Sequence, residues 1–266
     1  MSRDRAALVR HLGVSIAYVV CVVGSMVGVG LFGGTPIAEA AGGVLAADST
    51  HLAPDSPAFS VWSVIYGGLG LYTVWQWWDR TDPRRLAWPV VASLVLNAAW
   101  ILAVQAGQVW LSVAVIVALL VVLAVIFQRL LAVPPRSRVE ALVADGTLGL
   151  YLGWVSVATC ANTAAALLDS GFTGGGASEW WAVGVLAAVG VVGVALALVG
   201  RGRLAPTATI VWGLSWIAVG RTSGEPESST TAIAAVTVAV VVALVTIAVR
   251  LRTGLATRVG RQETTT

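Results

Sequence analysis

The chain has 266 residues, of which 58% are hydrophobic and 11% are charged. A soluble domain carries about 25% charged residues, so the composition excludes an ordinary soluble protein and predicts an integral membrane protein. The net charge of +3 comes from arginines that lie in short connections between apolar runs, as membrane topology requires, and therefore does not indicate a nucleic-acid partner.

Eight apolar runs approach the roughly 20 helical residues that are needed to cross about 30 Å of hydrocarbon. The seventh of them is the shortest. In chain order they are Val14–Ile37, Ala58–Trp78, Ala87–Ala106, Leu111–Leu131, Gly146–Leu168, Trp180–Gly200, Ala205–Gly220 and Thr231–Val249. We therefore expect an all-α, polytopic membrane helix bundle with about eight transmembrane helices.

The arginines test this count. Fifteen of the 16 precede the first run or follow an even-numbered run, from Arg80 after the second to Arg250 after the eighth, and Arg221 alone falls on the other side. Positive charge accumulates in cytoplasmic connections. The pattern predicts that the amino and carboxyl termini are both cytoplasmic, and we expect a bacterial plasma membrane.

The first run has a competing interpretation. Arginines, an apolar run and the sequence Ala38-Glu39-Ala40 are similar to a secretory signal with its cleavage site. The run is about twice as long as the apolar region of a signal peptide, which favours a retained helix. Cleavage would leave seven spans.

Small residues mark expected contacts between helices, because glycine lets two backbones approach where lipid supplies no hydrophobic driving force. We expect helix packing at Gly24 and Gly28 in the first run, Gly70 in the second, and Gly149 and Gly153 in the fifth. Such faces are also compatible with a homodimer. The two cysteines, Cys21 and Cys160, lie inside apolar runs without metal-ligand spacing, so we expect no metal site.

The longest outer connection, residues 38–57, is expected to fold over the mouth of the bundle, with His51 as a solvated loop residue. The tryptophans divide into two groups. One group lies at span ends, as in the aromatic belt of any membrane protein, and comprises Trp75, Trp77, Trp78, Trp88, Trp110, Trp180 and Trp181. The other group lies inside the spans and comprises Trp62, Trp100, Trp154, Trp212 and Trp216.

Spacing gives the inner aromatics a direction. Trp62 and Tyr66 are four residues apart and share a helix face, as do Asn97 and Trp100 at a spacing of three. At about 1.5 Å per residue, these residues, with Asn162 and Trp216, lie in the outer half of the membrane, and Trp154 is deeper. An amide that faces lipid would be unsatisfied, so both asparagines should point inward. They either line a pocket or simply tie helices together, with the tryptophans filling space.

Three segments carry a family resemblance. AFSVWSVIYGGLG, LNAAW and LYLGWVSVATCAN resemble motifs of the tryptophan-rich sensory protein or translocator protein (TspO/MBR) family, a five-helix membrane bundle. The positions that match those motifs are Trp62, Tyr66, Gly70, Asn97, Trp100, Tyr151, Trp154, Ala158 and Asn162. The motif prolines before the Val-Trp pair and before Tyr151 are missing. The resemblance implies a five-helix core over residues 1–168 and a three-helix membrane extension over 169–266, as in an eight-helix relative.

The resemblance also implies a function. Family members bind porphyrins, cholesterol-like lipids and synthetic aromatic ligands, so we expect a planar hydrophobic ligand, either a tetrapyrrole or a sterol-like lipid, and no required cofactor. The expected ligand-binding residues are Trp62, Tyr66, Asn97, Trp100, Tyr151, Trp154, Asn162 and Trp216. Membrane lipid and this ligand are the expected partners, beside a second copy of the chain.

Two alternatives remain open, an uncoupled transporter or facilitator and a structural membrane protein without a ligand. Coupled transport is disfavoured because no charged residue lies clearly within a span; Asp145, before the fifth run, is interpreted as a helix N-cap. An enzyme is not expected, because the spans contain no nucleophile–base pair and no metal cluster.

Overall fold

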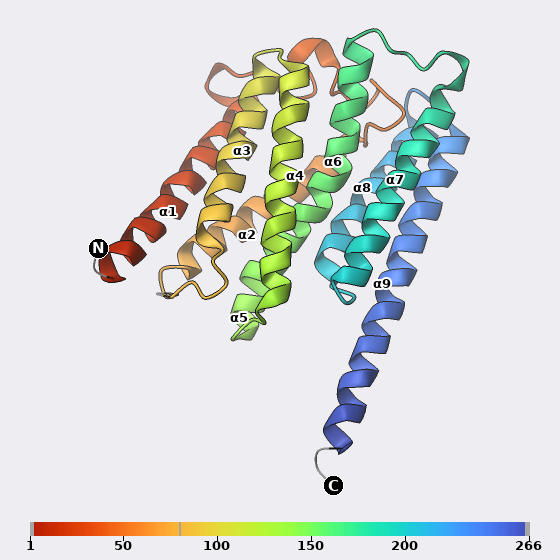
Figure 1. The fold of residues 1–266 in the computed structure, drawn as a ribbon. Helices are drawn as coiled ribbons and strands as arrows, with labels where there is room; N and C mark the ends of the chain where they lie inside the picture. The colour runs from red at the N-terminus through yellow and green to blue at the C-terminus, as the bar shows by residue number, and fades with distance from the viewer. Residues whose placement is uncertain (1–2, 80, 264–266) are drawn as a thin grey trace.

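A computed structural model describes residues 3–79 and 81–263, so the expected cytoplasmic position of Arg80 lies outside the described residues. The described residues form eight long helices (Figure 1), which confirms the expected all-helical membrane bundle. The long helices are α1 (Arg3–Gly28), α2 (Val61–Trp75), α3 (Ala87–Gln105), α4 (Val109–Ala132), α6 (Thr147–Asp169), α7 (Ser178–Val199), α8 (Leu204–Ser223) and α9 (Ser229–Glu263). The short elements are η1 (Leu31–Gly33), η2 (Ala40–Gly43), η3 (Ser56–Ser60), α5 (Arg138–Glu140), the π-helical η4 (Ala141–Gly146) and η5 (Gly175–Ala177).

Within the described ranges, six helical segments are long and apolar enough to cross a membrane by length and composition. α2 and α8 are outside this set. α8 has 20 residues but buries polar side chains, including Thr207 and Thr209. α2 has only 15 residues, so the second helix, and not the seventh, is the shortest of the eight.

α2 is short because it begins inside the bundle. The preceding segment descends along α8: the backbone N–H of Asp55 donates to the carbonyl of Trp216 at 3.2 Å, and Trp212 Nε1 donates to the carbonyl of Ala58 at 2.9 Å. Figure 1 shows α2 starting part-way along the bundle. The depths expected for Trp62 and Tyr66, which assumed a start at the outer surface, are therefore too shallow.

The first helix also differs from its expected range. α1 starts at Arg3 and ends at Gly28, whereas the apolar run continues to Ile37. Gly30 and Gly33 take left-handed backbone conformations (φ 87° and 84°) that glycine adopts without steric cost, and these turns end the helix. The backbone N–H of Ile37 then returns to the carbonyl of Gly28 at 3.0 Å.

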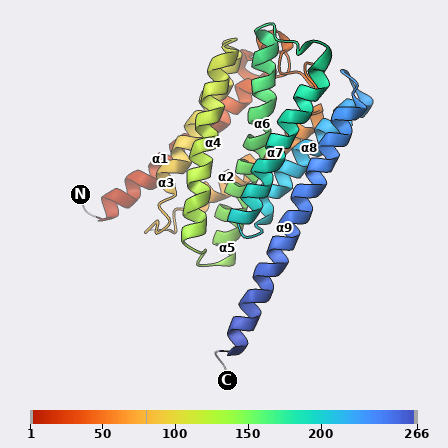
Figure 2. The same cartoon turned by 45° about the vertical axis from the view of Figure 1, so that its right-hand side comes forward.

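The helices follow one another in space in the order α1, α3, α4, α6, α8, α9 and α7, with α2 packed on α1 and α6. Figures 1 and 2 both place α7, α8 and α9 together on the side of α6 away from α1. α6 is consequently central and highly buried: Tyr151, Leu152, Trp154 and Val155 are almost inaccessible. Such a helix can carry side chains to cavities on two of its faces.

The glycines expected at contacts lie where helices meet. A Cβ on Gly24 would stand 3.3 Å from Ala98 Cβ, and one on Gly149 would stand 2.8 Å from Ala205 Cβ. A Cβ on Gly28 would meet Ile101 at 3.1 Å. Because the α1 glycines already pack against α3 within the chain, they do not supply a free dimer face, and the homodimer stays a prediction.

Gly70 and Gly153 are the tightest of these contacts. A Cβ on Gly70 would stand 2.6 Å from the Tyr18 hydroxyl oxygen, and one on Gly153 would collide with the carbonyl oxygen of Pro206 and with Thr209 Oγ1. Cβ atoms do not approach other atoms this closely without displacing them. Gly153, which faces backbone, therefore requires glycine for the observed packing, whereas a Cβ at Gly70 would require the Tyr18 side chain to move.

A cluster of charged side chains connects the segments that precede α3, α6 and α8. Arg84, which is 3% exposed, pairs with Asp145 at 2.6 Å and with Glu140 at 3.5 Å, and Arg203 also pairs with Asp145. Asp145 lies inside the π-helical segment before α6. Its interpretation as an N-cap is therefore wrong: it is an ion-pair acceptor that links the connections before α3, α6 and α8.

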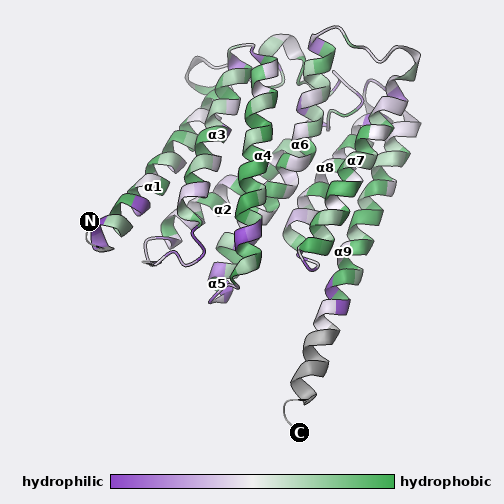
Figure 3. Ribbon diagram, in the orientation of Figure 1, coloured by the Kyte–Doolittle hydropathy of each residue, from purple (hydrophilic) through white to green (hydrophobic). Residues whose placement is uncertain are grey.

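Both termini lie at one end of the bundle (Figure 1), together with the connections that follow α2, α4 and α7. Hydrophobic residues extend along the helices and most hydrophilic residues lie at the ends (Figure 3). The arginine-rich connections thus share one end, as the alternation in sequence requires.

Candidate ligand-binding site

A cavity lies between α2, α3, α4 and α6, beneath the outer connection. Its volume is about 50 Å³, room for a few waters at roughly 10–15 Å³ each on this measure. The residues that line it are Ile37, Val44, Leu45, Ser49, Thr50, Ala53, Pro54, Phe59, Trp62, Asn97, Trp100, Ile116, Leu119, Trp154, Val155, Ala158, Ala161, Asn162 and Ala165. We call it the aromatic cavity.

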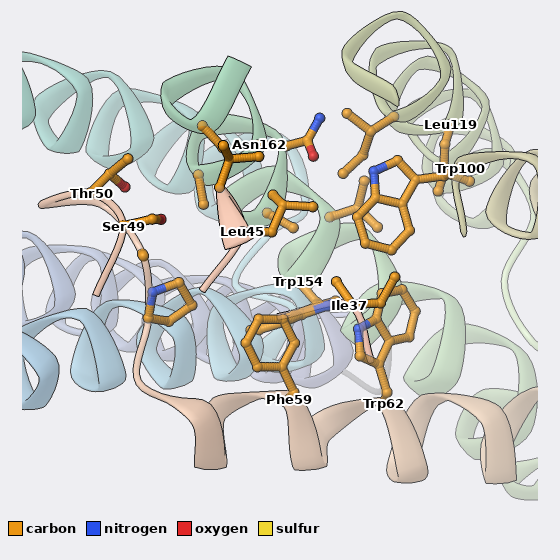
Figure 4. Close-up of a pocket in the computed structure, with 18 of the residues that line it drawn as sticks. Ile37, Leu45, Ser49, Thr50, Phe59, Trp62, Trp100, Leu119, Trp154 and Asn162 are labelled. Carbon is orange, nitrogen blue, oxygen red and sulfur yellow. The ribbon is translucent and has the colours of Figure 1, made fainter. Parts of the chain in front are cut away.

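Three rings form one wall (Figure 4). Trp62 on α2 and Trp154 on α6 meet edge to face with their centroids 6.2 Å apart, and Phe59 of η3 approaches Trp154 at 5.9 Å in the same manner. Edge-to-face pairs are a favourable geometry for aromatic rings. The descent of residues 53–58 into the bundle brings Trp62 down to the level of Trp154, so two tryptophans of different expected depth become neighbours.

Trp100 on α3 stands apart from this wall, across the cavity (Figure 4). Its indole nitrogen and that of Trp154 are buried, and neither has a hydrogen-bond partner among the described residues. A buried donor without a partner costs about 1–3 kcal/mol. A ligand or water with an acceptor oxygen would remove this penalty.

The floor of the aromatic cavity is a hydrogen-bond network centred on Asn97. Tyr66 Oη donates to Asn97 Oδ1 at 2.9 Å, and Asn97 Nδ2 donates to Tyr151 Oη at 3.0 Å. The Tyr151 hydroxyl donates in turn to the carbonyl of Ser93 at 3.4 Å, and the Cys21 thiol approaches Asn97 Oδ1 at 3.6 Å. Asn97 itself lines the cavity, whereas Tyr66 and Tyr151 do not and lie behind Trp62.

Asn162 lines the other side of the aromatic cavity. Its amide nitrogen donates to Ser112 Oγ on α4 at 3.0 Å, so this side chain also joins two helices. Both asparagines point into the bundle, as expected. Each combines the two roles that the sequence left open, since it borders the cavity and holds neighbouring helices together.

Trp216 is not among the residues that line the aromatic cavity. Its ring packs edge to face on Trp212 at 5.6 Å, and its carbonyl accepts from the N–H of Asp55. The two α8 tryptophans thus hold the descending segment before α2. Spacing alone could not distinguish this role from a place in the wall.

The roof consists of the outer connection, which Arg221 of α8 fixes in place. Arg221 is 1% exposed, and its guanidinium donates to the carbonyls of Thr50 at 2.9 Å and Ala47 at 2.7 Å. These hydrogen bonds hold the outer connection, which the sequence predicts to cover the bundle, against α8. Neither Arg221 nor Phe59 was identified from the sequence as a residue of the site. Arg221 could have been found, because it is the one arginine on the outer side of the predicted topology.

Most of the tryptophans expected in the interfacial belt are exposed: Trp77, Trp78, Trp88, Trp110, Trp180 and Trp181. Trp75 is partly buried against the core. In the described part of the chain, no group of three or more His, Cys, Asp or Glu side chains is placed to hold a metal ion.

The chain matches a known protein family. A family model described as TSPO-like protein matches residues 13–248. The match runs from α1 into α9 and so includes the helices beyond residue 168; the division of the chain at that residue stays a prediction. No curated protein and no solved structure matches the chain.

Proposed function

Because the chain belongs to the family of TSPO-like proteins, we propose that this integral membrane protein binds a planar hydrophobic ligand, a tetrapyrrole or a sterol-like lipid, in the aromatic cavity. The observation that carries the proposal is the pair of buried, unpartnered indole N–H groups of Trp154, in the aromatic wall, and Trp100, across the cavity from that wall. Flat rings offer stacking area, and the two donors would pair with a carboxyl, carbonyl or hydroxyl oxygen of the ligand.

Binding of such a ligand requires the roof to move. Pockets for drug-sized ligands measure about 300–1,000 Å³, whereas the aromatic cavity is about 50 Å³. The outer connection covers it through Val44, Leu45, Ser49 and Thr50. We take the described conformation as the closed state, from which displacement of residues 44–54 would open the cavity toward the outer surface.

The proposal is for binding without catalysis. Besides the tryptophan indoles, the polar side chains that line the aromatic cavity are Ser49, Thr50, Asn97 and Asn162. Neither hydroxyl is hydrogen-bonded to a base that would activate it as a nucleophile: Ser49 Oγ donates to the carbonyl of Ala46, and Thr50 Oγ1 has no partner among the described residues. We also propose that both termini are cytoplasmic in a bacterial plasma membrane, which the arginine-rich connections at the terminal end support.

The test is a fluorescence titration of the purified protein with protoporphyrin, haem and dehydroergosterol, each of which can accept tryptophan emission. Saturable quenching at micromolar concentration by one class identifies the ligand type. Trp62→Ala should weaken that binding, because it removes a stacking surface worth about 1 kcal/mol or more, equivalent to at least about fivefold in Kd.

Trp78→Ala is the matched control, since Trp78 is 74% exposed and lies away from the cavity. Equal changes in affinity for Trp62→Ala and Trp78→Ala, with both variants folded, would show that the ligand does not occupy the aromatic cavity. Absence of saturable quenching by all three compounds would contradict the proposed ligand class.

A further inference from the structure

A second, larger cavity lies on the opposite face of α6. It is bounded by α6, α7 and the part of the outer connection around His51, and its volume is about 400 Å³, within the usual range for ligand pockets. The residues that line it are Ser49, Thr50, His51, Leu52, Thr159, Cys160, Thr163, Ala164, Leu167, Leu168, Phe172, Thr173, Gly174, Ser178, Trp181, Ala182, Val185 and Pro226. We call it the lateral cavity.

The lateral cavity is distinct from the aromatic cavity. Consecutive residues of α6 divide between the two: Ala161 and Asn162 line the aromatic cavity, and Cys160 and Thr163 line the lateral one. Ser49 and Thr50 border both. The outer connection is therefore a partition, and a ligand on one side need not touch the other.

One end of the lateral cavity is polar and incompletely paired. Thr50 Oγ1 and His51 Nδ1 are buried and have no hydrogen-bond partner within the described ranges. The other ring nitrogen of His51 lies 3.4 Å from Ser178 Oγ. His51, which the sequence places in solvent as a loop residue, is partly buried. Buried polar groups in proteins are nearly always satisfied, so unpaired polar atoms on two consecutive residues indicate a missing partner.

The rest of the lining is mostly apolar, and the hydroxyls of Thr159 and Thr163 are already used, since they donate to backbone carbonyls within α6. Its apolar members include Leu167, Leu168 and Val185, and Phe172 packs edge to face on Trp181 at 5.9 Å. None of the residues that line the cavity carries a carboxylate or a guanidinium group. An ionic head group would therefore lose its hydration without gaining a direct counter-charge.

We propose that the lateral cavity is a binding site for a neutral lipid-like amphiphile with a hydroxyl head, whose head pairs with Thr50 and His51 and whose chain lies along Leu167, Phe172 and Trp181. A hydroxyl group both donates and accepts. It therefore satisfies His51 Nδ1 in either tautomer and also pairs with the threonine hydroxyl, whereas a ketone or ether could only accept.

Cys160 provides a reporter that the chain already contains. It lines the lateral cavity, whereas Cys21 is fully buried in the core, and peptide mapping distinguishes the two thiols without any substitution. The experiment measures the rate at which N-phenylmaleimide modifies Cys160 in lipid nanodiscs that contain dodecanol, laurate or dodecane at equal mole fraction. Dodecanol should slow the modification several-fold, and laurate and dodecane should not.

Two variants locate the protection. His51→Leu removes the polar partner and should abolish protection by dodecanol; Thr50→Val makes the same test if His51→Leu does not fold. Ala161→Leu fills the aromatic cavity from the neighbouring α6 position and should leave protection unchanged. The proposal is overturned by equal protection from all three compounds, by no protection from dodecanol, or by protection that is lost in Ala161→Leu but kept in the folded His51→Leu protein.

Discussion

The amide nitrogen of Asn97 on α3 donates a hydrogen bond to the phenolic oxygen of Tyr151 on α6 at 3.0 Å. The same side chain accepts from Tyr66 on α2 through its amide oxygen at 2.9 Å. One asparagine thus joins three helices directly beneath the aromatic cavity. Its hydrogen-bonding groups are engaged within the protein, so its main effect on the cavity is to fix the floor.

Replacement of Asn97 should therefore reduce stability more than ligand affinity. Asn97→Ala leaves the buried Tyr151 hydroxyl without its donor and the Tyr66 hydroxyl without its acceptor, and each unsatisfied group costs about 1–3 kcal/mol. Unfolding in detergent should occur at a lower temperature or denaturant concentration. Tyr66→Phe removes one bond of the network and should have a smaller effect. A larger loss for Tyr66→Phe than for Asn97→Ala would contradict the central role of Asn97.

Substitution of Gly67 and of Gly153 by alanine should change the free energy of unfolding in opposite directions. Alanine stabilises a helix interior by about 0.8–1.0 kcal/mol relative to glycine. A Cβ on Gly67 meets nothing within 4 Å, whereas one on Gly153 collides with the backbone of Pro206 on α8. We expect Gly67→Ala to be neutral or stabilising and Gly153→Ala to cost about 1–3 kcal/mol from overpacking. Equal thermal stability of the two variants would show that α6 and α8 are not closely packed.

The sequence predicted the helical bundle well because its signals are local. Apolar runs and arginine positions are read directly along the chain, and glycine positions such as Gly153 indicate close packing without knowledge of the partner. The motif residues Trp62 and Trp154 were likewise identified, and the structure brings them together at 6.2 Å.

Other features depended on contacts between distant segments. Residues 53–58 enter the bundle because Trp212 and Trp216 pair with their backbone, and no periodicity in the α2 region reports this. The ion pair between Arg84 and Asp145 joins residues that lie in two separate connections. The lateral cavity similarly forms only because α7 lies beside α6. The sequence shows that α7 follows α6 in the chain but does not show how the two helices pack.

His51 should make stability depend on pH. Burial lowers the pKa of this imidazole below its usual 6.5, and the nearby Arg221 lowers it further, with Glu179 opposing. Between the two values the unfolded state binds more protons than the folded state, so the folded protein loses stability as pH falls below about 6.5. Melting temperatures of the wild type and His51→Gln should diverge between roughly pH 7 and pH 5. If the melting temperatures of the two proteins change in parallel with pH, the pKa of His51 is not lowered in the folded protein.

The topology can be tested with reporter fusions. Both termini and the arginine-rich connections share one end of the bundle (Figure 1), and the positive-inside rule assigns that end to the cytoplasm. Fusions after Arg138 and Arg203 should report a cytoplasmic location, and fusions near Asp48 and Asp169 an external one. A periplasmic signal after Arg138 would overturn the arrangement.

The charge cluster at the terminal end should hold the core against the last three helices. Arg84 is 3% exposed and pairs with Asp145, which also pairs with Arg203. Removal of one partner from a buried ion pair leaves an uncompensated charge and costs about 3–5 kcal/mol. Asp145→Asn should therefore destabilise the protein by several kcal/mol in chemical unfolding. Because Arg84 and Asp145 are both shielded from solvent, added salt should change this difference little.

Asp169→Asn, at the opposite end of α6 and without an ion pair among the described residues, is the matched control and should have little effect. A loss for Asp145→Asn that disappears at high salt would show that the cluster acts as a surface network and does not fasten the two parts of the bundle.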